Sequence, residues 1–170
     1  MTGMPIDIKT LQTNRKTEHH NSMKQTLIFE TLLPCSVERL FEFHADTNNL
    51  PLITPTDTRV EILKLETPLT QGNTAVLRIK KGWLSFVWEL RFEKVEYPHL
   101  IVDVAMRSPF KTFRHEHHFI KSDETHSILR DVVTFALPLA PLSNVAVWFV
   151  KRELKKMFAY RHQKTKEAMA

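Results

Sequence analysis

His115, His117 and Asp131 are the side chains whose types and spacing in this sequence best suit chemistry. Imidazole and carboxylate groups transfer protons, form hydrogen bonds and bind metal ions. Because side chains of a β-strand alternate between two faces, both histidines share one face with Phe113 and Phe119. The pattern therefore predicts a polar group within an otherwise apolar strand face.

The pairing of two neighbouring strands decides which histidine faces the carboxylate. Asp131 lies on an apolar face of the next extended segment. If the turn between the segments is centred near Glu124, the numbers of opposed residues sum to about 248. This register places His117 opposite Asp131, and a shift by one step would place His115 there instead.

Three interpretations of these residues remain open. The carboxylate and an imidazole can form a buried pair that only satisfies both polar groups. They can also act in a ligand pocket and orient a hydroxyl or carbonyl group. Finally, His115, His117 and Asp131 are candidate catalytic residues, and a His-x-His pair with a carboxylate can bind zinc or iron. Since no fourth ligand is evident, we expect no metal and no cofactor.

Composition excludes several nucleotide-dependent classes. The 170 residues include three glycines, at positions 3, 72 and 82. Phosphate-binding loops, dinucleotide fingerprints and nucleophile elbows need clustered glycines, where the backbone approaches a ligand or turns sharply. No such cluster can be drawn here. A single cysteine, Cys35, excludes an internal disulfide and is typical of a reducing compartment, so we expect a cytoplasmic protein.

The remaining pattern predicts the elements that position these residues. Residues 1–22 show no apolar periodicity and are expected to form a disordered leader, followed by one domain over 23–170. A strand at 25–33 precedes two short helical segments, the first capped by Ser36. From Asp57 onward the apolar period changes from that of a helix to that of a strand. Strands are expected at 59–65, 74–80, 84–93, 100–106, 112–121 and 128–137.

A long helix is predicted at residues 142–169. Its expected apolar face consists of Leu142, Ala146, Phe149, Leu154, Met157, Phe158 and Arg161. Seven Lys or Arg residues and two Glu residues in this segment account for the whole net charge of +5. Because the basic residues follow one helix, we expect no nucleic-acid partner. Trp148 beside Lys151 and Arg152 would allow weak contact with an anionic membrane surface or with a protein.

Helices at the ends of an antiparallel meander are typical of an α+β fold, in which the helices pack on one face of the sheet. Several motifs make this layout more specific. They are Ser108-Pro109-Phe110, Phe113-x-His115-x-His117-x-Phe119, Leu129-x-Asp131-x-Val133-x-Phe135, Ala140-Pro141-Leu142 and Phe158-Ala159-Tyr160-Arg161. On these residues the sequence resembles the START-like, or SRPBCC, superfamily from about residue 23 to the end. Members usually carry glycine where this chain has Ser108, Ala140 and Ser143, and tryptophan in place of Phe113.

The resemblance implies a helix-grip fold, with a curved antiparallel sheet of about six to seven strands wrapped around the long C-terminal helix. It also implies a cavity between the concave face and that helix, which holds lipids, sterols or polyketides in the superfamily. The residues expected to line it are Phe86, Trp88, Leu90, Phe92, Phe113, His115, His117, Asp131, Val133 and Phe149.

One strand is ambiguous. The resemblance draws attention to Asp103, whereas apolarity turns the alternate residues Leu100, Val102, Val104 and Met106 inward. A bulge could reconcile the two assignments, and both remain open at this point.

Three functions follow as hypotheses. The first is binding, carrying or sensing of a hydrophobic small molecule, with no cofactor. An alternative is an enzyme of the polyketide cyclase or dehydratase type, in which His115 or His117, tuned by Asp131, acts as general acid or base. Another alternative is docking to a membrane or a protein partner through the basic helix.

Overall fold

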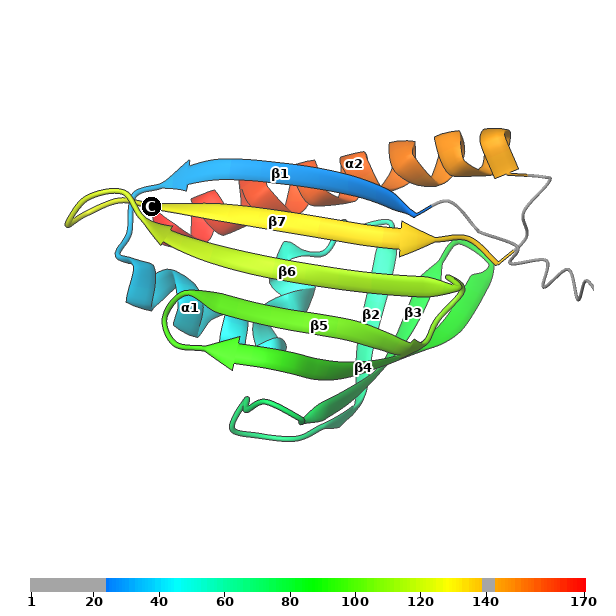
Figure 1. The fold of residues 1–170 in the computed structure, drawn as a ribbon, viewed down its shortest axis with the longest axis horizontal. Coiled ribbons are helices and arrows are strands. Elements are labelled where there is room, and N and C mark those ends of the chain that lie inside the picture. Colours follow the sequence, from blue (N-terminus) through cyan, green and yellow to red (C-terminus); the bar gives the residue numbers. More distant parts are fainter. Residues whose placement is uncertain (1–23, 139–142) are drawn as a thin grey trace, which may run out of the picture.

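Residues 24–138 and 143–170 are described by the computed structural model of the chain. The predictions for residues 1–22 and for the Ala140-Pro141-Leu142 motif lie outside this part. One curved sheet carries the long helix along one side, and two short helices lie near one end (Figure 1). The elements are β1 (Gln25–Leu33), α1 (Val37–Ala45), η1 (Thr47–Ile53), β2 (Thr58–Leu65), β3 (Thr74–Lys81), β4 (Leu84–Glu96), β5 (Leu100–Arg107), β6 (Thr112–Lys121), β7 (Ser127–Ala136) and α2 (Ser143–Met169).

The sheet has seven strands in the order β1-β7-β6-β5-β4-β3-β2, and all neighbours are antiparallel. From β2 to β7 each strand pairs with the next along the chain, as in a meander, and β1 closes the far edge against β7. The strand directions change across the sheet, which gives it a concave face (Figure 1). The predicted α+β helix-grip architecture is confirmed.

Strands β6 and β7 carry the predicted polar residues on the concave face. Burial alternates strictly along β6, where Phe113, His115, His117 and Phe119 are buried and their neighbours are not. In the observed register, His117 lies opposite Asp131 and His115 lies opposite Val133. The pairing predicted from the turn position is therefore confirmed, because the burial of one face fixes the register.

Strand β5 turns Ile101 and Asp103 toward the concave face. Asp103 pairs with His115 on one side and with Phe92 on the other. Leu100, Val102 and Val104 share the convex face with Glu116, so the inward assignment from apolarity is wrong. The β4–β5 register shifts between Phe92 and Lys94, where a bulge interrupts the pairing. Apolarity misled here because β5 has apolar residues on both faces.

The helices cover the concave face from two directions. Ser36 caps α1 as predicted, and its hydroxyl oxygen accepts a hydrogen bond from the Arg39 backbone N–H at 3.3 Å. Helix α1 packs on β6 and β7, and α2 packs on β1 and η1. No helix among the described residues is long and apolar enough to cross a membrane.

The buried face of α2 differs from the predicted one. It is formed by Leu154, Phe158, His162, Thr165 and Met169, which recur every three or four residues as a helix requires. Phe149 is 56% exposed, so its prediction as part of the apolar face is wrong. Phe149 lies five positions before Leu154, which is about 140° around the helix axis from that residue.

Two apolar clusters occupy the concave face. The α1 cluster consists of Leu33, Cys35, Val37, Leu40, Phe41, Ala75, Phe92, Ile101, Phe119, Leu129 and Met169. The Phe158 cluster consists of Phe113, Val133, Phe135, Leu154 and Phe158. Between them the same strands and the same helix present polar side chains.

Candidate functional site

Five polar residues form a layer between the two apolar clusters. The polar layer consists of Asp103 from β5, His115 and His117 from β6, Asp131 from β7 and His162 from α2. Each residue is between 3% and 8% exposed. Charged groups removed from water in this way are costly unless they are paired, so their mutual contacts decide whether the layer is tolerated.

Asp131 contacts all three histidines of the polar layer. Its Oδ2 accepts a hydrogen bond from Nε2 of His162 at 2.9 Å. Its Oδ1 lies 2.9 Å from Nδ1 of His117 and 3.2 Å from Nε2 of His115, at lengths but not at angles typical of hydrogen bonds. Asp131 is thus the shared partner that holds the layer together.

Asp103 lies on the other side of the two imidazole rings. Its Oδ2 is 3.4 Å from Nε2 of His117 and 3.6 Å from Nδ1 of His115. The two rings are 3.8 Å apart between centroids. Each ring therefore has one nitrogen toward Asp131 and the other toward Asp103.

The surrounding charges shift the pKa values of the layer in opposite directions. Burial alone would lower the pKa of His117, but the carboxylates of Asp131 and Asp103 outweigh burial and raise it to about 9. Burial lowers the pKa of His115, and the positive charge of His117 lowers it further. The pKa of Asp131 is well below its ordinary value, because the charges of His117 and His115 outweigh its burial. The layer thus favours a cation on one histidine over cations on both.

Two further basic side chains lie near the layer. Burial and the charge of His117 lower the pKa of His44 to about 3, so this ring is neutral, and its Nδ1 lies 3.1 Å from the Leu40 carbonyl oxygen. Burial also lowers the pKa of Arg161, while the charges of Asp131 and Asp103 oppose this effect. The Arg161 guanidinium stacks over the Phe158 ring at 5.5 Å.

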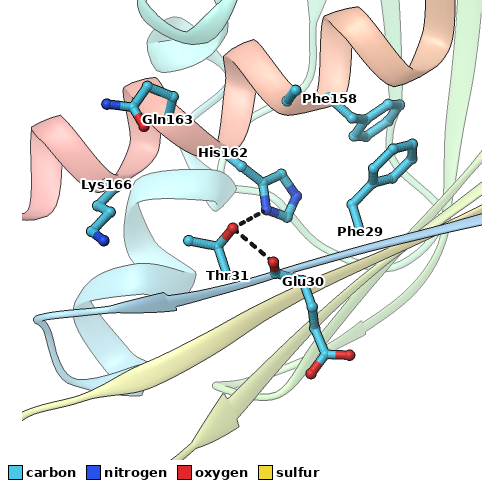
Figure 2. Close-up of a pocket in the computed structure, with 8 residues that line it drawn as sticks. Phe29, Glu30, Thr31, Phe158, His162, Gln163 and Lys166 are labelled. Carbon is cyan, nitrogen blue, oxygen red and sulfur yellow. Dashed lines mark hydrogen bonds between the residues drawn. The ribbon is translucent and has the colours of Figure 1, made fainter. Parts of the chain in front are cut away.

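A pocket of about 270 Å³ opens between β1 and α2 (Figure 2). It is lined by Phe29, Glu30, Thr31, Phe158, Ala159, His162, Gln163 and Lys166. The Phe29 and Phe158 rings stack at 4.6 Å on one side, and Thr31 Oγ1 lies 2.8 Å from Nδ1 of His162 (Figure 2). His162 lines this pocket and also contacts Asp131, so one member of the polar layer borders the pocket.

None of the ten residues predicted to bind a ligand lines this pocket. His115, His117 and Asp131 lie in the polar layer, where Asp131 contacts the pocket residue His162. Phe113 and Val133 are buried in the Phe158 cluster, and Phe92 in the α1 cluster. Phe86, Trp88 and Leu90 are half-buried on the concave side of β4, and the Trp88 ring packs edge-on against Phe113 at 4.9 Å. Phe149 is exposed and apart from these residues.

His162 and Asp103 are the site residues that sequence reasoning missed or left open. His162 follows Leu154 and Phe158 at intervals of four, and this spacing was a usable signal. The predicted apolar face included Arg161 at this turn instead of His162. Asp103 alternates with residues that face away from the concave side, so its position was compatible with the site. The apolar residues before and after it made the opposite face of the strand look buried.

Comparisons with known proteins address the fold and the family of the chain. Residues 33–162 match the model of a family described as polyketide cyclase/dehydrase and lipid transport. No curated protein matches the chain significantly. Among solved structures, the chain is similar to the ZhuI aromatase/cyclase from Streptomyces sp. R1128, with a TM-score of 0.71 and 14% identity over 86% of this chain and 94% of the other. It is also similar to a START superfamily protein from Mycobacterium smegmatis, with a TM-score of 0.65 and 14% identity over 85% and 99%.

At these identities the two solved structures establish the fold alone. The family model is independent of them and covers most of the chain, including β6, β7 and most of α2. Together they confirm the START-like resemblance found in the sequence.

Proposed function

The chain belongs to the polyketide cyclase/dehydrase and lipid transport family, and we propose that it binds an apolar small molecule beneath α2. The ligand enters between β1 and α2, and its polar group is held by the polar layer. The chain then acts as a carrier or sensor of that molecule and requires no chemical step.

The pocket between β1 and α2 carries this proposal. One side is aromatic, with the stacked rings of Phe29 and Phe158. Another side is polar, with Thr31 and His162 in contact at 2.8 Å. An apolar wall with a few converging polar groups is the usual composition of a small-molecule site.

The two kinds of wall have different roles in binding. Apolar ligand surface contributes about 25 cal/mol for each Å² buried, before the cost of association. A ligand hydroxyl or carbonyl buried without a partner would cost free energy, so contact with His162 selects ligands that carry such a group. Lys166 and Gln163 at the rim are exposed, and the Lys166 ammonium can contact a polar end of the ligand that remains in water.

Filling the pocket tests the proposal. Ala159 is exposed on α2 and lines the pocket, so Ala159→Trp blocks it without altering the buried core. Ala168 lies on the opposite side of the same helix, and Ala168→Trp is the matched control. With the anionic fluorescent probe 1-anilinonaphthalene-8-sulfonate, whose aromatic rings bind apolar pockets, we expect saturable binding to the wild type and to Ala168→Trp, and at least tenfold weaker binding to Ala159→Trp.

Equal binding of the probe to all three proteins would place it elsewhere and contradict the proposal. The absence of any probe binding to the wild type would contradict it as well.

A catalytic role of the cyclase or dehydratase type is a second candidate. The observation that favours it is the close approach of the His117 and Asp131 side chains, at 2.9 Å, in a buried setting. Cyclisation with dehydration removes water, so His117→Ala would accumulate a bound substrate heavier than the wild-type product by one water molecule. If the bound masses of the two proteins are equal, the chain is a binder and not an enzyme of this type.

A surface role is a third candidate, favoured by exposed apolar residues on the first half of α2. Val145, Trp148 and Phe149 are exposed, and the Arg152 guanidinium lies 5.6 Å from the Trp148 ring. Such a basic and aromatic surface suits an anionic bilayer. Vesicles of anionic phospholipid should sediment the wild type and release Trp148→Ala, and failure to sediment the wild type removes this candidate.

A further inference from the structure

Three possible ligand atoms of the polar layer converge on one point. Oδ2 of Asp103, one ring nitrogen of His115 and one of His117 all lie within 4.8 Å of one another. All three residues are buried and lie on adjacent paired strands, so their backbones are fixed relative to one another. Such an arrangement holds its ligand atoms in place before any ion binds.

Hydrogen bonding leaves the imidazoles of His115 and His117 incompletely satisfied. Nε2 of His115, Nδ1 of His117 and Oδ1 of Asp131 are buried and have no hydrogen-bond partner among the described residues. The four ring nitrogens of His115 and His117 all face carboxylate oxygens, which accept hydrogen bonds and cannot donate them. When both imidazoles are neutral they supply two N–H groups, and with these directed to the nearer Oδ1 of Asp131 each ring keeps one nitrogen lone pair. The other two nitrogens then direct lone pairs toward Asp103. One added proton satisfies one of them, whereas one metal ion satisfies both and the Asp103 oxygen as well.

The distances on the Asp103 side fit a metal ion better than hydrogen bonds. At 3.4 and 3.6 Å, the two contacts are longer than ordinary N–H···O bonds. Ligand atoms about 2.0–2.1 Å from a tetrahedral Zn²⁺ ion are separated from one another by about 3.3–3.4 Å. Octahedral geometry at the same bond lengths would require about 3.0 Å. The two distances from Asp103 to the imidazoles are therefore closer to the tetrahedral value than to the octahedral one.

The Asp131 side supplies the support that metal-bound histidines usually have. A histidine that binds a metal through one nitrogen typically donates its other N–H to a carboxylate. Oδ1 of Asp131 lies within 3.2 Å of that second nitrogen on both rings. Asp131 is itself anchored by His162, and His162 by Thr31. The two carboxylates also match the charge of a divalent cation.

We propose that Asp103, His115 and His117 bind a divalent transition-metal ion, with Zn²⁺ geometry, and that Asp131 orients both histidines. Three protein ligands leave one tetrahedral position for water or for a ligand oxygen atom. The metal site uses three members of the polar layer, whereas the proposed binding of an apolar molecule needs no metal.

Metal titration of the full chain tests the site. His19 and His20 are replaced by alanine in every sample to remove an alternative source of imidazole. After treatment with a chelator, Co²⁺ is added as a spectroscopic substitute for Zn²⁺. We expect one equivalent to bind with the intense visible absorption of four-coordinate Co²⁺, and one equivalent of Zn²⁺ to displace it. Zn²⁺ should also raise the melting temperature, because it binds the folded state.

Variants separate ligands from supporting residues. His117→Ala and Asp103→Asn should weaken Co²⁺ binding at least about 100-fold, and Asp131→Asn about 10–100-fold. His118→Ala is the matched control, because His118 follows His117 on the convex face and should leave the affinity unchanged. If His117→Ala fails to fold by circular dichroism, the nearly isosteric Asp103→Asn decides the test.

Either of two results would overturn the proposal. One is the absence of stoichiometric Co²⁺ or Zn²⁺ binding in the wild-type background. The other is binding that Asp103→Asn leaves unchanged. Both results are independent of probe uptake in Ala159→Trp, so this proposal and the proposed function can fail separately.

Discussion

The polar layer and the Phe158 cluster share one sheet face and one helix but differ in what stabilises them. Along β6 the face changes from His117 and His115 to Phe113, and along α2 it changes from His162 to Phe158. The Phe158 cluster stabilises the fold by removing apolar surface from water. The polar layer must offset the desolvation of at least two carboxylates, which an apolar replacement would avoid. A feature that opposes local stability in this way is expected at a functional site.

The two regions also differ in how they tolerate substitution. An apolar cluster loses stability in proportion to the volume removed, and its neighbours can partly relax into the space. The polar layer depends on matched donors and acceptors, so loss of one member leaves several others without a partner. Four substitutions sharpen this contrast.

Phe158→Ala should have the largest effect on stability. The Phe158 side chain is fully buried, stacks on Phe29 at 4.6 Å and packs edge-on against His115 at 5.0 Å. We expect the free energy of unfolding to fall by about 3–5 kcal/mol. Urea denaturation followed by circular dichroism measures this change. A loss below about 1 kcal/mol would show that α2 is not a major part of the core.

Asp131→Asn should be the most damaging conservative change in the polar layer. The amide keeps the shape of the carboxylate but lacks its charge and brings an N–H₂ group toward ring N–H groups. We expect a loss of about 1.5–3 kcal/mol in urea denaturation. Glu30→Gln on the adjacent strand removes an exposed carboxylate that pairs with Arg130, and should change stability by less than about 1 kcal/mol. Equal effects of the two substitutions would contradict the role assigned to Asp131.

Thr31→Val isolates one outer contact of the layer. The substitution keeps the size and β-branching of the side chain but removes the hydroxyl group 2.8 Å from Nδ1 of His162. A loss of about 1 kcal/mol is expected, because that nitrogen is left without its partner. Thr26→Val, on the same strand but exposed, is the control and should be nearly neutral. The contact is unimportant if the two variants unfold at the same urea concentration.

Phe149→Ala should have the smallest effect. Its side chain is mostly exposed, and it belongs neither to the Phe158 cluster nor to the polar layer. We expect a change within about 0.5 kcal/mol in the same urea experiment. A loss comparable to that of Phe158→Ala would show that Phe149 lies on the buried face of α2 and would contradict the face assigned to this helix.

The sequence was sufficient to predict the fold and the centre of the polar layer. Strict alternation along β6 and β7 and the length of the turn between them determined that His117 faces Asp131. These inferences succeeded because they rest on local periodicity and on a short hairpin. The predicted strands 25–33 and 112–121 agree with β1 and β6 in full.

The residues that were missed depend on long-range packing. The buried face of α2 is set by its approach to β1, which no local pattern encodes, and the face includes the polar residues His162 and Thr165. A helix face that mixes polar and apolar residues gives a weak periodic signal. The pocket between β1 and α2 was not predicted for the same reason, because its walls come from two elements that are more than 100 residues apart in the chain.

Native mass spectrometry of the freshly purified protein tests the central claim most directly. If the pocket between β1 and α2 leads an apolar molecule to the polar layer, the wild type and Ala168→Trp should each carry one co-purifying apolar mass that dissociates on denaturation. Ala159→Trp should lack it. A wild type with no bound mass, or an Ala159→Trp variant with the same bound mass, would contradict the account.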